Sequence, residues 1–321
     1  MVRISYKIFA HIFLAVIIML ILCSCEAPTS SARFEETYIL IGNLVSGEPI
    51  SHEFPIFLGK TVSVPNGNLF DAFITDAEVT IYNSNGEAET ELFFSVWMSD
   101  SASVPQMGYI DFQQTFLPQA GEQYRIVAKI PNSETGATDS VWAETTMPAA
   151  INVVADSCFA GEYQLPLPEL EYEDADERHP LRIQTPDASP IRLHLVLYCL
   201  DDWQDVRYIG EFGFGENEAL EEEDQYENSS SGSPRRVENF FEYTAELADD
   251  GHYYVDIDAY HHLFVFYGAY QIKIYSVDEN YYRYLYKSEG YRFGGIHNGF
   301  GYFGGKSGTA LYTRVVNGNL N

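Results

Sequence analysis

The 321-residue chain is poor in basic residues. Lysine and arginine number 18 against 47 aspartates and glutamates, so the formal net charge is −29. A surface of this sign repels nucleic acid and anionic lipid headgroups, and no nucleic-acid partner is predicted. The charge favours solubility in an exposed location, and the open alternative is attraction of cations or of a basic partner surface.

Long apolar runs are also scarce, and the clearest one is too short to cross a membrane. Ile12–Leu22 holds eleven consecutive apolar residues, whereas a spanning helix needs roughly 18 or more. Two basic residues precede this run, and the small Ser24 and then Cys25 follow it. The layout predicts a lipoprotein signal peptide over residues 1–24, and a plain secretory signal with two cysteines is the alternative.

Cys25 is the predicted lipidation site. Cys23 is the rival acceptor, but it would place Leu22 at the cleavage position, where signal peptidase II needs a small side chain. Acyl chains on Cys25 bury many methylenes at roughly 0.8 kcal/mol each, which holds a protein at a bilayer with no polypeptide inside it. Residues 25–35 then form a polar tether. The processed chain has 16 basic and 47 acidic residues, a net charge of −31.

Cysteine is scarce as well, because only Cys158 and Cys199 remain as free thiols after Cys25 is lipidated and Cys23 is removed. In an oxidising compartment these two are candidates for a disulfide that would join the start of a second domain to a core strand. Two buried free thiols are the equal alternative, because spacing in the sequence does not establish the geometry that a disulfide needs.

Aromatic residues are abundant, with 24 tyrosines and 21 phenylalanines, and this composition predicts an all-β fold with one short helix near the C-terminus. Short strands separated by turn residues predict an immunoglobulin-like β-sandwich over residues 36–148. Tyr124, Ile126, Ala128 and Ile130 alternate with less apolar residues, as in a strand with one buried face. The predicted strands are Thr37–Asn43, Glu53–Leu58, Ala77–Tyr82, Leu92–Trp97, Tyr109–Gln113, Gln123–Ile130 and Val141–Thr146.

Residues 149–321 are predicted to form a second β-rich domain. Ile191–Leu200 is mostly apolar and is the clearest strand. Ser276 and Glu279 have capping-box spacing, and Gly290 follows the apolar positions, which predicts a short helix between them. Further predicted strands are Val206–Phe214, Tyr253–Ile257, Leu263–Tyr267 and Tyr270–Val277.

Three segments of this half are less regular. Glu169–Glu177 and Glu216–Gly232 are too charged to join a core, and we predict that residues 169–177 and 216–232 are exposed acidic loops. Arg236–Ala248 has partial helical spacing, although its basic start and acidic end oppose the helix dipole.

Metal-ligating residues occur together at one place in the sequence. Asp256 and Asp258 alternate along a predicted strand and therefore face the same side, with His261 and His262 shortly after. This set offers ligands for a hard or borderline cation. It lacks a calcium-loop or zinc spacing, and alternating carboxylates are common on exposed sheets, so no metal ligand is assigned.

Catalytic and nucleotide-binding motifs are lacking. Gly301–Ser307 resembles a phosphate loop but fails its spacing, and Gly308–Val316 after it is predicted to be a strand. No G-x-S-x-G, H-E-x-x-H or S-x-x-K pattern occurs, and His194 is interpreted as a core or sheet-face histidine. We therefore predict no enzyme, no catalytic residue and no cofactor. Paired carboxylates for glycoside hydrolysis stay open, because their spacing is spatial.

Five segments together carry a family resemblance. These are Tyr38–Leu44, Asp76–Glu87, Gln123–Ile130 with the later Thr145–Pro148, the strand and tyrosine-rich segment Ile272–Tyr286, and the glycine-aromatic segment His297–Gly304. In them the chain resembles the Bacteroidota outer-membrane lipoproteins of domain-of-unknown-function family 4249. The acidic residues 216–232 depart from the pattern of that family. Its closing glycines fit tight turns and close backbone approach.

The resemblance implies a lipoprotein of the bacterial outer membrane, on the cell surface or on the periplasmic face. It also implies an accessory role beside a TonB-dependent transporter, which would be the protein partner. We therefore predict a non-catalytic binding or accessory lipoprotein. The alternatives are a carbohydrate-active or other hydrolytic surface lipoprotein and a cation-binding surface protein.

Overall fold

The predicted all-β class is confirmed, since 56% of the structure is strand. The computed structural model describes residues 36–62, 72–98, 105–132, 135–154, 156–172, 179–186, 188–202, 205–210, 235–287, 289 and 294–318. These residues contain one α-helix, α3 (Glu279–Tyr286), and a 3₁₀ turn, η2 (Ala259–Leu263). No helix within these ranges is long and apolar enough to cross a membrane.

A six-stranded antiparallel sheet holds most of the predicted first domain, in the order β17-β7-β6-β3-β4-β5. Its strands are β3 (Glu78–Asn83), β4 (Ala88–Trp97), β5 (Gln106–Ile110), β6 (Gln123–Pro131), β7 (Thr138–Thr146) and β17 (Ile296–His297). In β6 the predicted alternation is confirmed. The four inward positions from Tyr124 to Ile130 are buried, whereas Arg125 and Lys129 between them are exposed.

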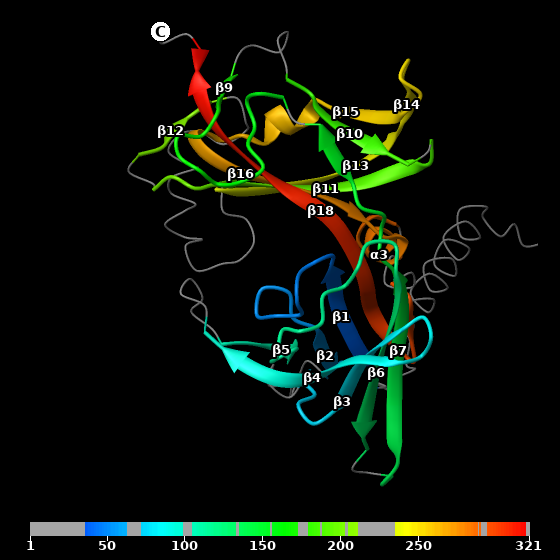
Figure 1. The fold of residues 1–321 in the computed structure, drawn as a ribbon. Helices are drawn as coiled ribbons and strands as arrows, with labels where there is room; N and C mark the ends of the chain where they lie inside the picture. Colours follow the sequence, from blue (N-terminus) through cyan, green and yellow to red (C-terminus); the bar gives the residue numbers. More distant parts are fainter. Residues whose placement is uncertain are drawn as a thin grey trace, which may run out of the picture. The chain divides into compact units, whose positions relative to one another are not determined.

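An eight-stranded sheet combines strands from both halves of the chain. Its main order is β13-β11-β16-β18-β1-β2, with β12 on β16 and β9 on β18. The strands are β1 (Tyr38–Val45), β2 (Phe57–Lys60), β9 (Glu169–Tyr172), β11 (Pro190–Cys199), β12 (Arg207–Tyr208), β13 (Arg236–Thr244), β16 (Phe266–Val277) and β18 (Gly299–Asn317). The first part of β18 pairs in parallel with β1, and the rest pairs antiparallel with β16 (Figure 1).

A third sheet has four strands in the order β14-β15-β10-β8. They are β8 (Asn152–Val154), β10 (Leu181–Thr185), β14 (Glu246–Leu247) and β15 (Tyr253–Ile257). Its inward residues share a hydrophobic core with β11, β16 and the second part of β18.

The described residues form two large hydrophobic cores, one mainly from residues before position 148 and one from residues after it. The eight-stranded sheet, in contrast, contains strands from both sides of this position. In the first core, the six-stranded sheet packs against residues of β1 and β2 and against Phe303 of β18, which makes a β-sandwich. In the second core, Leu311 and Val315 of β18 pack with the strands of residues 149–321. The two predicted domains therefore share one strand.

The predicted helical spacing in Arg236–Ala248 is wrong, because Arg236–Thr244 is strand β13. It pairs with β11 from Pro190 opposite Thr244 to Tyr198 opposite Arg236. A complete ladder with a neighbouring strand outweighs the weak local preference for helix, as is common where tertiary pairing is extensive.

Two further predictions need correction. The loop predicted at residues 169–177 is wrong over its first four residues, which form β9 and bury Leu170 and Tyr172 against the second core. The predicted helix exists as α3, but its N-cap is Asp278 and not Ser276. The loop predicted at 216–232 lies outside the described residues, as do Gly290 and the signal peptide and tether up to residue 35.

Candidate functional site

The predicted lipidation site, Cys25, lies outside the described residues, so the anchor stays a prediction. Cys158 and Cys199 are both described, and both are buried free thiols. This is the second of the two alternatives that the sequence left open. Burial raises the pKa of the Cys199 thiol to about 11, so it stays protonated at neutral pH.

The residues of the candidate cation site do not converge. Asp256 on β15 forms a two-point ion pair with Arg182 on β10, with both nitrogen–oxygen distances at 2.8 Å. Asp258 stands at the start of η2, while His261 is buried within that turn. A different set, Asp156, Cys158 and His179, does come together, and sequence spacing gave no sign of it because 23 positions separate the histidine from the aspartate.

The segment that resembles a phosphate loop is part of strand β18, and the predicted strand Gly308–Val316 is confirmed. Its glycines allow close approach of neighbouring backbone. A Cβ on Gly301 would collide with the carbonyl oxygen of Leu40, and one on Gly308 with that of Ile274. These glycines therefore have the structural role that the sequence suggested.

A polar cluster around the buried His194 and Lys306 links β11, β13 and β18. The Lys306 ammonium lies 3.3 Å from Nδ1 of His194 and 3.2 Å from the Tyr281 hydroxyl, and Nε2 of His194 lies 3.1 Å from a Glu238 carboxylate oxygen. The His194 ring also stacks on Phe240, with centroids 4.1 Å apart. The interpretation of His194 as a satisfied sheet-face histidine is therefore confirmed.

Burial and charge set the protonation of this cluster. Burial lowers the pKa of Lys306 to about 8, and it lowers the pKa of His194 as well. The hydrogen bond from His194 lowers the pKa of Glu238 to about 2. A neutral His194 that accepts from Lys306 on Nδ1 must carry its proton on Nε2, where it donates to Glu238. Lys306 and His194 are buried, whereas the Glu238 side chain is 42% exposed, so the cluster reaches the surface only at its carboxylate and suits a structural role.

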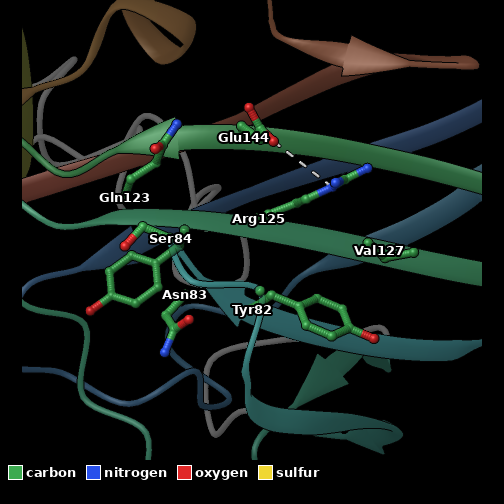
Figure 2. Close-up of a pocket in the computed structure, with 9 residues that line it drawn as sticks. Tyr82, Asn83, Ser84, Gln123, Arg125, Val127 and Glu144 are labelled. Carbon is green, nitrogen blue, oxygen red and sulfur yellow. Dashed lines mark ion pairs between the residues drawn. The ribbon is translucent and has the colours of Figure 1, made fainter.

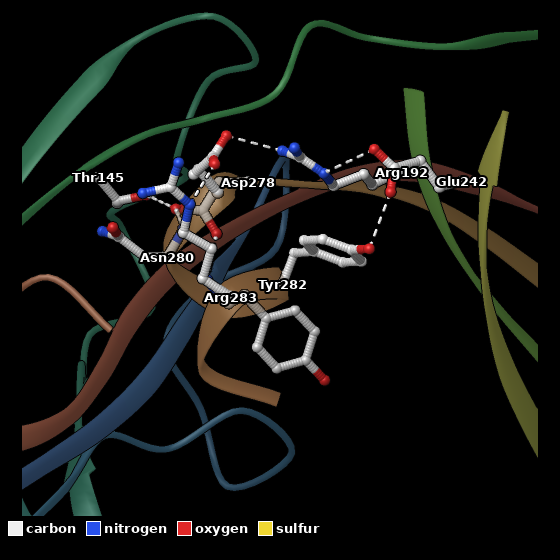
Figure 3. Close-up of polar contacts among 9 residues, drawn as sticks. Thr145, Arg192, Glu242, Asp278, Asn280, Tyr282 and Arg283 are labelled. Carbon is white, nitrogen blue, oxygen red and sulfur yellow. Dashed lines mark hydrogen bonds and ion pairs between the residues drawn. The ribbon is translucent and has the colours of Figure 1, made fainter. Parts of the chain in front are cut away.

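The start of helix α3 is a second polar junction (Figure 3). Asp278 accepts from the backbone N–H groups of Asn280 and Tyr281, and the Thr145 hydroxyl donates to it over 2.8 Å. Nδ2 of Asn280 donates to the carbonyl oxygens of Glu144 and Phe303. These hydrogen bonds hold the start of the helix against β7 and β18.

The first turn of α3 also contacts strands β11 and β13. Arg192 on β11 pairs with Glu279 at 2.8 Å, and its guanidinium lies 4.5 Å from the centre of the Tyr282 ring. The Tyr282 hydroxyl donates to Glu242 on β13 over 2.8 Å (Figure 3). These contacts join the helix to β11 and β13, which indicates a structural junction, although Nε of Arg192 is buried without a hydrogen-bond partner and lies 3.7 Å from the Glu242 carboxylate.

A recess of about 380 Å³ opens on the six-stranded sheet beside the β3–β4 turn (Figure 2). Tyr82, Arg125 and Glu144 are cross-strand neighbours on β3, β6 and β7, so they form one row across its floor. The amides of Asn83 and Gln123 stand beside this row. Its volume falls within the ~300–1,000 Å³ common for small-ligand sites.

Local contacts hold the recess in shape. Oδ1 of Asn83 accepts from the backbone N–H groups of Asn85 and Glu87, which fixes the β3–β4 turn. The Arg125 guanidinium lies 4.2 Å from the centre of the Trp142 ring, which itself stacks on His297 with centroids 3.7 Å apart. The arginine is therefore positioned by an aromatic surface.

The charges of the recess nearly cancel. Arg125 and Glu144 lie 3.9 Å apart, and both side chains are almost half exposed. A guanidinium, a carboxylate, an amide and a phenol together offer hydrogen-bond donors and acceptors with no net charge. Such a surface suits a neutral polar ligand with hydroxyl or amide groups.

No family model matches this chain, and no curated protein matches it either.

Proposed function

We propose that the protein is a lipid-anchored, non-catalytic binding protein of the bacterial outer membrane, accessory to a TonB-dependent uptake system. The sequence layout around Cys25 supports the anchor, because a short apolar run, a small residue and a cysteine occur in the order of a lipoprotein signal. The resemblance to the Bacteroidota family supports the outer membrane and the transporter as partner.

The binding role rests on the row of Tyr82, Arg125 and Glu144 in the recess of the six-stranded sheet. The ligand that fits this row is a neutral molecule rich in hydroxyl or amide groups, such as a glycan or a peptide. Its hydroxyls or amides would donate to Glu144 and accept from Arg125 and from the Gln123 amide. The ring of Tyr82 supplies an apolar face at the same place.

A binding screen with the full chain in detergent tests the recess. The chain is probed with arrays of neutral glycans and of peptides, and we expect at least one class to bind. Arg125→Ala should weaken that binding at least tenfold, because it removes the donor at the centre of the row. Arg207→Ala, an exposed arginine on β12, is the matched control and should bind as the unaltered chain does. No binding, or binding insensitive to Arg125, would refute the assignment.

Fractionation of cells tests the anchor and the partner. The unaltered chain should enter the detergent phase and the outer-membrane fraction, whereas Cys25→Ala should lose the lipid and leave that fraction. Solubilised outer membranes should yield a transporter together with the lipidated chain. Recovery of the lipidated protein alone would count against the accessory role. Protease treatment of intact cells distinguishes the cell surface from the periplasmic face.

A further inference from the structure

Asp156, Cys158 and His179 bring three kinds of metal-ligating atom together. A carboxylate oxygen, the thiol sulfur and an imidazole nitrogen all lie within 4.8 Å of one another. The ligand atoms of a tetrahedral zinc site lie roughly 3–4 Å apart, because Zn–S bonds measure about 2.3 Å and Zn–N and Zn–O bonds about 2.0–2.2 Å. Nδ1 of His179 and Oδ2 of Asp156 already have such a spacing, at 3.1 Å.

The sheet brings these residues together although they are distant in sequence. Asp156 and Cys158 follow strand β8, and His179 precedes strand β10. The two strands pair antiparallel, with Val154 opposite Arg182, so the end of one strand lies beside the start of the other. The ladder therefore fixes the distance across the cluster.

Neighbouring groups orient the ligands. The backbone N–H and the hydroxyl of Ser157 both donate to Oδ1 of Asp156, which leaves Oδ2 directed toward His179. The hydroxyl of the buried Tyr260 donates to the backbone carbonyl of His179 over 2.6 Å. Partners of this kind hold the ligands of metal sites in place, and their loss typically lowers metal affinity about 10–100-fold.

The ligand chemistry selects the metal. Calcium and magnesium prefer sites made only of oxygen atoms, whereas one sulfur, one nitrogen and one oxygen suit zinc and related divalent transition metals. Cys158 is 7% exposed, so the sulfur side of the cluster is shielded from water, while the Asp156 side is open. Three protein ligands leave a fourth position for water on the open side.

We propose that Asp156, Cys158 and His179 form a binding site for a divalent transition-metal ion of the zinc class. On binding, the Cys158 thiol releases its proton to solvent and the sulfur forms a bond to the metal. His179 binds as a neutral imidazole, and Asp156 binds as a carboxylate. The ion would join the residues that follow β8 to those that precede β10. Strand β9, which pairs with β18, lies between these two strands in the sequence.

Cobalt binding tests the site directly, because a cobalt–thiolate bond absorbs in the near ultraviolet. The full chain in detergent, treated with a thiol-free reductant, is titrated with Co²⁺ alone. We expect a charge-transfer band that saturates at one ion per chain and disappears when Zn²⁺ is added. Zn²⁺ should also raise the melting temperature, since an ion that binds only the folded state stabilises it.

Variants assign the ligands. Cys158→Ser should remove the band, and His179→Gln should weaken Co²⁺ binding by more than about 100-fold, because losing a ligand costs more than losing a supporting contact. Ser157→Ala should weaken it about tenfold. The matched controls, Cys199→Ser and His252→Gln, should keep the band and the affinity.

Folding is checked on each variant by circular dichroism without metal. If Cys158→Ser fails to fold, the folded His179→Gln and Ser157→Ala chains still decide the question. Absence of a charge-transfer band in the unaltered chain, or a band that persists in Cys158→Ser, would overturn the proposal.

Discussion

At the scale of single residues, the cluster of Lys306, His194 and the partly exposed Glu238 makes stability depend on pH. The hydrogen bond from His194 holds the pKa of Glu238 at about 2, below its ordinary value of 4.5. The unfolded chain therefore takes up a proton before the folded chain does as the pH falls. The stabilisation from this group is present above about pH 4.5 and is lost progressively as the pH falls through about 2.

Replacement of the carboxylate tests this dependence. Glu238→Gln should flatten the acid side of the curve of melting temperature against pH, relative to the unaltered chain. Glu246→Gln, in an exposed position on β14, is the matched control and should leave that curve unchanged. Equal acid slopes in Glu238→Gln and in the unaltered chain would contradict the prediction.

Asp278 makes a second prediction at this scale. It caps α3 and accepts a hydrogen bond from the Thr145 hydroxyl, so Asp278→Ala removes the cap and leaves a donor without its partner. We expect a loss of about 1–3 kcal/mol in the free energy of unfolding, measured with urea. Asp249→Ala, at an exposed turn position, should change it by less than about 0.5 kcal/mol. A similar small change in both variants would show that the cap contributes little.

Sequence reasoning found this helix but assigned the wrong cap. Ser276 and Glu279 have the spacing of a capping box, which predicts Ser276 as the N-cap. In the structure Ser276 belongs to β16 and its hydroxyl donates to the carbonyl oxygens of Ala149 and Ser307. The Ser276 side chain therefore bonds to residues that are distant in the sequence. Local spacing does not reveal such hydrogen bonds.

At the scale of elements, the close pairing of strand β18 with its neighbours depends on its glycines. Gly301 has a φ of +112°, and a Cβ there would meet the Leu40 carbonyl oxygen of β1. Gly301→Ala should therefore lower the free energy of unfolding by more than about 1 kcal/mol. Gly161→Ala is the matched control, because nothing lies within 4 Å of the position of its Cβ. Equal stability of the two variants in urea would contradict the close pairing of β1 and β18.

The sequence predicted the buried face of β6 correctly, but it missed β9 and β13 as strands and gave no strand partners. The alternation in Gln123–Ile130 reports which face is buried, and the structure confirms that face in β6. The same kind of pattern carries no information on which strand lies beside another, because side-chain periodicity is the same for any partner. The candidate metal ligands were missed for this reason, since the pairing of β8 with β10 creates their proximity.

At the scale of the whole molecule, the strand shared by the two cores predicts cooperative unfolding. Phe303 packs in the first core and Leu311 in the second, on the same strand. Phe303→Ala, with an expected cost of about 3–5 kcal/mol, and Leu311→Ala, with about 2–5 kcal/mol, should each shift one common transition.

Two probes measure this cooperativity. In a Trp203→Phe background, tryptophan fluorescence reports on Trp97 and Trp142 of the six-stranded sheet, and far-ultraviolet circular dichroism reports on all strands. Their unfolding curves should coincide in the unaltered chain and in both variants. Separate transitions, with each variant shifting only one of them, would show that the two cores unfold independently.

The parallel pairing of β1 with β18 also dictates the order of events when the chain is made. A ribosome releases Tyr38 long before Gly299, its partner in the ladder. Until β18 emerges, β1 lacks its parallel neighbour and the sandwich lacks Phe303. Non-local pairing of this kind forms slowly. The eight-stranded sheet therefore stays incomplete until residues 299–306 have been made, and a chain without its finished sheet is in the extended state that passage through a membrane requires.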